Sequence, residues 1–194
     1  MSLQNRFKSL HYNSPVILTM TLLSLGALIL QNITRGYTTS LLFSVYRSSP
    51  FSIFFYFRLF GHVLGHANWE HYMNNFLLIL LLGPMLEEKY GSKRIAFMIA
   101  VTAVVTGVIN ILLFPRTALL GASGVVFMFI LLSSFVNFKK GRIPITFILV
   151  VIIYLGGEVM YGIFIKDNIS QLAHLVGGIC GSVFGFKWAE RSSW

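Results

Sequence analysis

The chain has 194 residues, of which 56% are hydrophobic and 11% are charged, and its formal net charge at pH 7 is +9. A soluble domain usually carries about 25% charged residues, so most of this surface must face lipid rather than water. The fifteen basic residues lie in small groups between apolar stretches, and this pattern excludes an ordinary nucleic-acid-binding face. The single cysteine, Cys180, excludes an intrachain disulfide.

Six segments are long and apolar enough to cross a bilayer core of about 30 Å. In chain order they are 15–34, 66–87, 95–114, 121–138, 143–165 and 170–188. We therefore expect an all-α membrane protein, a bundle of six transmembrane helices. It forms a single domain over 1–194, with short tails at about 1–14 and 189–194.

The stretch 37–61, between the first two predicted spans, is unusually rich in phenylalanine and tyrosine and is interrupted by Pro50. Aromatic side chains favour the headgroup region of a bilayer, so this stretch is expected to lie at the outer interface. An ordinary loop with aromatic anchors is the alternative.

Basic residues at the ends of the spans predict the orientation. With the N-terminus inside, ten of the fifteen lie at the inner face, as the positive-inside rule requires. Both termini are then cytoplasmic, and the chain is a multi-pass protein. Its small size and the lack of a transit-like extension favour the plasma (cell) membrane of a prokaryote, with an organellar membrane as the alternative.

Two polar residues near the starts of predicted spans suggest chemistry. Ser123 lies in Gly121-Ala122-Ser123-Gly124 at the start of the fourth span, and His174 opens the sixth. Polar groups at membrane depth are costly and are a functional hypothesis by default. A serine hydroxyl needs a neighbouring base to become a nucleophile, and a neutral histidine suits that role. The equally weighted alternative is a histidine that only packs or bonds between helices.

The predicted topology also matches these two residues in depth. Ser123 lies 16 residues from the basic residue Lys139, and His174 lies 13 residues from Lys187. These separations correspond to heights of about 24 and 20 Å above the inner face. No acidic residue is well placed as a third member, because Asp167 and Glu158 lie in a loop and in another span. A two-member Ser–His dyad is expected, and Glu158 is given no catalytic part.

Small residues predict that the sixth span packs closely on another helix. Ala173, Gly177, Gly181 and Gly185 recur at four-residue spacing and form one stripe, which permits close backbone approach. Generic helix packing explains such a stripe equally well.

An oxyanion would need hydrogen-bond donors, and the second span offers two. His71 and Asn75 are one helical turn apart and project from one face, and the backbone N–H of Ser123 at a helix start adds a third. The alternative takes His62, His66 and His71 as metal ligands. The metalloprotease string His-Glu-x-x-His does not occur, so we expect no metal.

These strings together resemble the rhomboid family of intramembrane serine proteases. The similarity extends from Phe57-Arg58 in the first loop to Gly181 in the last span and includes the string from Glu87 to Ser92. It implies a compact six-helix core and a Ser–His dyad in a water-filled cavity open to the outer side. It also implies cleavage of transmembrane protein substrates near the outer membrane boundary, without metal or cofactor.

Carried over residue by residue, the resemblance makes Ser123 the nucleophile and His174 the general base and acid. The oxyanion and substrate-binding candidates are His71, Asn75 and Gly121. Arg58 and Glu87 match structural positions. The chain has Phe127 where many relatives have tyrosine four residues after the serine. Its ring can still pack against His174, so altered tuning rather than inactivity is expected.

Two other function classes are weighed against the protease. A non-catalytic rhomboid-like protein that binds membrane clients is expected to lack the serine or the histidine, and this chain has both. A small transporter often shows internal repeats, and none is evident. The expected partners are transmembrane protein substrates and the lipid bilayer, with no nucleic acid.

Overall fold

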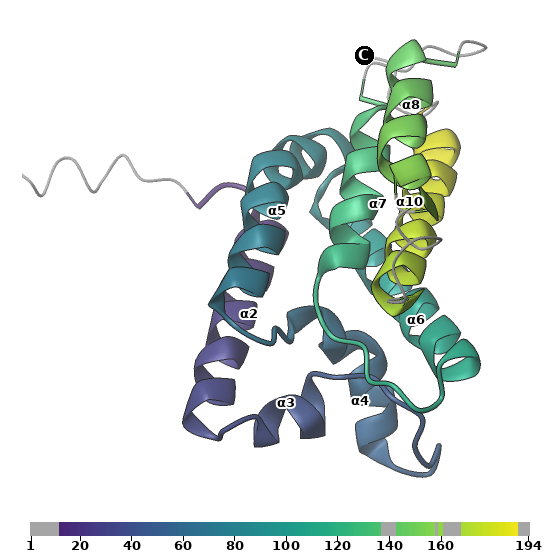
Figure 1. The fold of residues 1–194 in the computed structure, drawn as a ribbon. Coiled ribbons are helices and arrows are strands. Elements are labelled where there is room, and N and C mark those ends of the chain that lie inside the picture. The colour runs from purple at the N-terminus through teal and green to yellow at the C-terminus, as the bar shows by residue number, and fades with distance from the viewer. Residues whose placement is uncertain (1–11, 137–142, 158, 161–167, 190–194) are drawn as a thin grey trace, which may run out of the picture.

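The computed structural model describes residues 12–136, 143–157, 159–160 and 168–189, and they are mostly helical (Figure 1). In the described part of the chain, the single β pairing is an isolated bridge between Val45 and Leu119. The helices are α2 (Pro15–Ile33), α3 (Tyr37–Leu42), α4 (Ile53–Gly61), η1 (His62–Leu64), α5 (Trp69–Tyr90), α6 (Ser92–Leu113), α7 (Ser123–Ser133), α8 (Ile145–Val150), η2 (Val151–Leu155) and α10 (Asn168–Ala189).

Each of the six predicted spans contains a helix, so the prediction of an all-α protein is confirmed. Within the described ranges, α2 and α6 are long and apolar enough to be candidate membrane spans by length and composition alone. Helix α5 is as long as α6, but it carries Glu70, Glu87, Glu88 and Lys89. These charges lower its mean hydropathy, although they lie only in its first and last turns.

Some predicted bounds are wrong. The second span begins and ends three residues later than expected, and the third begins three residues earlier. The two helices are separated by Gly91 alone, whose φ of 82° makes the tight turn that glycine permits. The fifth span is not one continuous α-helix, because α8 gives way to the π-helical turn η2 over Val151–Leu155. Hydropathy does not distinguish these two helix types. Glu158 and Asp167 lie outside the described residues.

Helix α7 is the centre of the bundle. It runs between α5 on one side and α10 on the other, with α6 behind it (Figure 1). Five of its apolar side chains are completely buried: Val125, Met128, Phe129, Leu131 and Leu132. A helix that is apolar on all faces is normally buried on all faces, which explains why this segment has no polar side.

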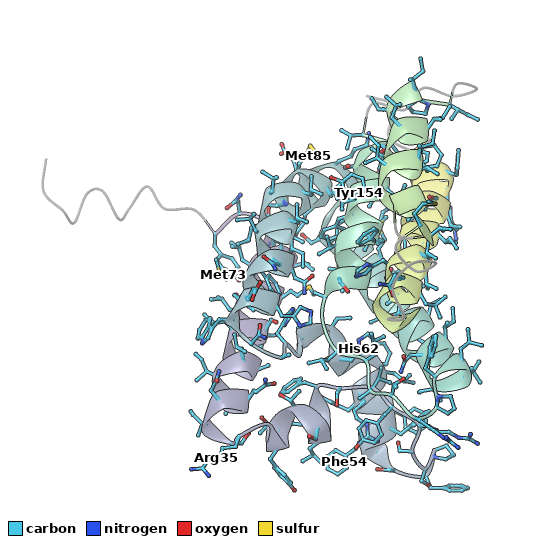
Figure 2. All side chains as sticks on the ribbon, in the orientation of Figure 1. Arg35, Phe54, His62, Met73, Met85 and Tyr154 are labelled. Atoms are coloured by element: carbon cyan, nitrogen blue, oxygen red, sulfur yellow. The ribbon has the colours of Figure 1, made fainter. Side chains whose placement is uncertain are left out.

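The aromatic-rich first loop contains structure of its own. Helices α3 and α4 lie at the lower end of the bundle in Figure 1, and Figure 2 shows Arg35 and Phe54 at the same end. Arg58 of α4 is buried, and its guanidinium donates to the Tyr46 hydroxyl at 3.1 Å and to Ser48 Oγ. The guanidinium also lies 4.3 Å from the centre of the Tyr46 ring. Arg58 therefore holds α4 against the preceding loop.

Glu87 links two helices that are far apart in the sequence. Its buried carboxylate accepts hydrogen bonds from the backbone N–H groups of Val16 and Ile17, each at 3.1 Å. These N–H groups belong to the first turn of α2, which begins at Pro15 and has no side-chain cap of its own. A carboxylate here also interacts favourably with the positive end of the helix dipole. Glu87 thus serves as the missing cap of α2.

Replacing Glu87 with alanine is expected to destabilise the protein by about 3 kcal/mol, because one buried and one partly buried backbone donor lose a charged acceptor. Glu87→Gln, which keeps one acceptor oxygen, should lose less. The matched control is Glu88→Gln, since Glu88 is the next residue and is exposed. Unfolding in detergent micelles, followed by circular dichroism, measures the three free energies. Equal stability of Glu87→Ala and Glu88→Gln would contradict the capping role.

Candidate active site

Ser123 is the first residue of the central helix α7, directly after Ala122. Its backbone N–H therefore belongs to the first turn, which has no acceptor within the helix. The residue is half-buried rather than sealed in the core. Before it, the N–H of Gly121 donates to the carbonyl of His62 at 2.9 Å, and Gly121 has a φ of +118° that a side chain would strain. The loop before Ser123 is therefore fixed against the first loop.

The predicted oxyanion residues converge on Gly121. A Cβ added to Gly121 would lie 2.7 Å from His71 Nε2 and 3.7 Å from Asn75 Nδ2. Asn75 is buried, and its Nδ2 has no hydrogen-bond partner among the described residues. Asn75 therefore has unused hydrogen-bonding capacity where it faces Gly121. A buried amide donor without a partner is costly. Glycine is required at 121, since any side chain would collide with the His71 ring.

The start of α5 orients His71. The side chain of Asn68 caps the helix by accepting from the backbone N–H of His71 at 2.8 Å. The backbone N–H of Ala67 donates to His71 Nδ1 at 3.5 Å, which is long for a hydrogen bond. If Nδ1 is the acceptor, Nε2 carries the proton of the neutral ring. The donor nitrogen is then the one that faces Gly121.

His174 lies in the first half of α10 and packs against α7. Its ring stacks on the ring of Phe127, with 4.3 Å between centroids and 6° between planes. The expectation that Phe127 can pack on this histidine is thus confirmed. Tyr154 of η2 contacts the Phe127 ring edge-on at 6.2 Å, and Figure 2 shows Tyr154 on the side of the bundle where α8 lies. Phe127 lies one helical turn after Ser123, so the stack holds His174 against the same turn of α7.

Glycines bring α10 and α7 into backbone contact. A Cβ on Gly177 would collide with the backbone of Gly124, and one on Gly181 would collide with the backbone of Met128. A Cβ on Gly185 would meet the ring of Phe135. The predicted close approach along this stripe is therefore confirmed, and its partner is the helix that begins at Ser123.

The other two histidines of the metal hypothesis bond to other groups, although the His66 ring also packs edge-on against the His71 ring, with 4.9 Å between centroids. His62 Nε2 donates to the carbonyl of Ala103 at 3.0 Å, and burial lowers the pKa of His62 to about 4, so its ring is neutral at pH 7. His66 Nδ1 contacts the hydroxyl of Ser24 at 3.1 Å. Among the described residues, no group of three or more histidine, cysteine or acidic side chains is placed to hold a metal ion.

Sequence reasoning missed a buried polar stripe on α6. Thr102, Thr106 and Asn110 are spaced four residues apart and are all buried. Asn110 Nδ2 donates to the carbonyl of Thr117 at 3.2 Å and lies 3.5 Å from that of Val45. It thereby holds the two segments that pair at Val45 and Leu119, directly before the serine motif. The four-residue spacing of polar side chains within an apolar span was the signal that could have revealed it.

The comparisons with known proteins decide the family. The family model of the rhomboid domain matches residues 54–191, which is most of the chain. The chain belongs to the rhomboid family. Its membership places it in a membrane as a multi-pass protein and supports an intramembrane protease function.

Two curated relatives illustrate how far the similarity reaches. This rhomboid chain is 30% identical over 138 residues to the Bacillus subtilis (strain 168) protein named "Putative rhomboid protease YdcA", covering 70% of this chain and 69% of that one. It is 26% identical over 142 residues to "Rhomboid-related protein 2" of Mus musculus, covering 66% of this chain and 47% of that one. The chain therefore matches about half of the length of the mouse relative.

Proposed function

We propose that this rhomboid chain is an intramembrane serine endopeptidase in which Ser123 is the nucleophile and His174 is the general base. The observation that carries the proposal is the convergence of His71 Nε2 and Asn75 Nδ2 on Gly121, two residues before Ser123. Donors aimed at a developing oxyanion are usually the largest single contribution to acyl-transfer catalysis. A purely structural bundle would not need a buried amide donor there without a partner.

The proposed reaction proceeds by acyl transfer. The Ser123 hydroxyl attacks the peptide carbonyl while His174 takes its proton, and the tetrahedral oxyanion accepts hydrogen bonds from His71, Asn75 and the Ser123 N–H. His174 then gives the proton to the departing amine, and an acyl-enzyme remains. Water, deprotonated by His174, attacks the ester, and the serine leaves with that proton. The products are an amine and a carboxylic acid.

The proposed substrate is a transmembrane protein that is cut near the outer boundary of the membrane. The site supports this location, because Ser123 lies at the end of α7 that faces the first loop and its aromatic helices (Figure 1). The substrate helix would enter laterally and unwind locally to expose the bond. We also propose six spans from the six apolar segments, and cytoplasmic termini from the distribution of basic residues. The proposed location is the cell membrane.

A serine-directed fluorophosphonate tests the proposal, because it reacts with activated serines only. The purified protein should be labelled, and Ser123→Ala should not. Ser133 at the other end of α7 supplies the matched control, since its hydroxyl donates to the Ile130 carbonyl; Ser133→Ala should be labelled like the wild type. Absence of labelling in the folded wild type would instead favour the alternative, a non-catalytic rhomboid-like protein that binds membrane clients.

A further inference from the structure

An apolar groove lies on the outside of the bundle, between α2, α6 and the end of the first loop. Its volume is about 230 Å³, and every lining side chain is apolar. It is formed by Val16 and Met20 of α2, Leu64 of η1, and Ala96, Ala100 and Ala103 of α6. It shares no residue with the proposed active site, which is formed by residues of α5, α7 and α10. In a membrane protein, such a groove contacts lipid.

The dimensions of the groove suit a narrow molecule. Ala96 and Ala103 are seven residues apart, so the groove follows α6 for about 10 Å. A helix with its side chains is about 10 Å wide and would occupy on the order of 800 Å³ over that length. A whole helix would therefore stand out of the groove, and only some of its side chains could enter. A hydrocarbon chain, which is much thinner, fits.

A second apolar pocket continues the groove across α2. Its volume is about 360 Å³, and it shares Val16, Met20 and Leu64 with the first. The two pockets are therefore adjacent, and apart from Thr19 in the second pocket all their lining residues are apolar. A molecule with two hydrocarbon chains joined at one end matches this arrangement better than a single chain does.

A basic residue lies at one end of the groove, where the two hydrocarbon chains of such a molecule would join. Lys93 lies three residues before Ala96, and positions 93, 96, 100 and 103 follow one face of α6. Lys93 and its neighbour Arg94 are both exposed. The carboxylate of Glu87, the acid that contacts Val16, is already bonded to the N–H groups of Val16 and Ile17. Because Lys93 is exposed and lies one turn before Ala96 on the same face of α6, its positive charge can meet an anion at that end of the groove.

We propose that this groove binds one phospholipid with an anionic headgroup, its acyl chains beside Met20 and its phosphate against Lys93. Given the orientation proposed above, the lipid comes from the cytoplasmic leaflet. It would contact η1 next to His62, whose ring is bonded to Ala103 O and whose carbonyl holds Gly121. The lipid would thus support, from outside, the loop on which the serine motif rests.

Photocrosslinking tests the proposal without any measurement of activity. The full chain is reconstituted in phosphatidylcholine vesicles that contain a minor fraction of phosphatidylglycerol with a photoreactive group midway along one acyl chain. After illumination, mass spectrometry should find the label on the α2 and α6 peptides that line the groove. The same probe on phosphatidylcholine should label these peptides less.

Two variants, each with a matched control, test the proposal. Lys93→Ser should reduce groove labelling roughly fivefold, the effect expected of one basic residue near an anionic headgroup. Lys187→Ser, which removes an exposed basic residue at the end of α10, should leave groove labelling unchanged. Ala100→Phe should fill the groove and abolish labelling, whereas Val108→Phe on the exposed face of α6 should not. Equal labelling in Lys93→Ser and Lys187→Ser, or crosslinks between two copies at the groove, would overturn the proposal.

Discussion

Ser123→Ala and His174→Ala are each expected to lower the rate of cleavage of a model membrane substrate by a factor on the order of 10⁴ or more. Residues that act as one nucleophile–base unit lose most of the activity when either is removed. The remaining donors at Gly121 cannot replace an attacking oxygen. The measurement is the initial rate of substrate cleavage in proteoliposomes, with the amount of folded protein fixed by circular dichroism.

His174→Phe separates chemistry from packing in the same assay. Phenylalanine keeps an aromatic face against the Phe127 ring, which now stacks at 4.3 Å, but it has no nitrogen to accept a proton. It should therefore be as inactive as His174→Ala while unfolding closer to the wild type. Cleavage by His174→Phe at more than a few per cent of the wild-type rate would refute the role of His174 as the base.

Gly177→Ala is expected to destabilise the protein by about 2–3 kcal/mol, although alanine is a better helix former than glycine. A Cβ at this position would collide with backbone atoms of Gly124, which cannot turn aside as a flexible side chain can. Overpacking of a close contact typically costs about 1–3 kcal/mol. Because Gly124 follows the serine and Gly177 follows His174 by three residues, any separation of the helices also separates the proposed dyad. Fluorophosphonate labelling should fall together with stability.

Gly26→Ala is the matched control for that substitution. Gly26 lies within α2, and a Cβ there would meet nothing within 4 Å. The same chemical change should be neutral or stabilising, by up to about 1 kcal/mol. Unfolding in detergent micelles measures both free energies. If Gly177→Ala and Gly26→Ala unfolded alike, helix contact at Gly177 would not limit stability.

Much of the candidate site was predictable because its signals are local in the sequence. Four-residue spacing put His71 and Asn75 on one face and the glycines of α10 in one stripe, and a helix repeats such spacing whatever surrounds it. The apolar segments likewise predicted helices in six places. Hydropathy could not predict the π-helical turn at Val151–Leu155, because both helix types place the same apolar residues in lipid.

The sequence by itself determined the helical membrane fold, the family and the two polar residues that stand out in apolar segments, since composition and short-range spacing carry that information. Only the tertiary structure decided which groups meet across long separations. Glu87 caps a helix 70 residues earlier, and the His62 carbonyl holds Gly121. The packing of the helices determines such partners. Every residue except proline has the same backbone N–H and carbonyl groups, so the sequence does not indicate which acceptor or donor each of them will meet.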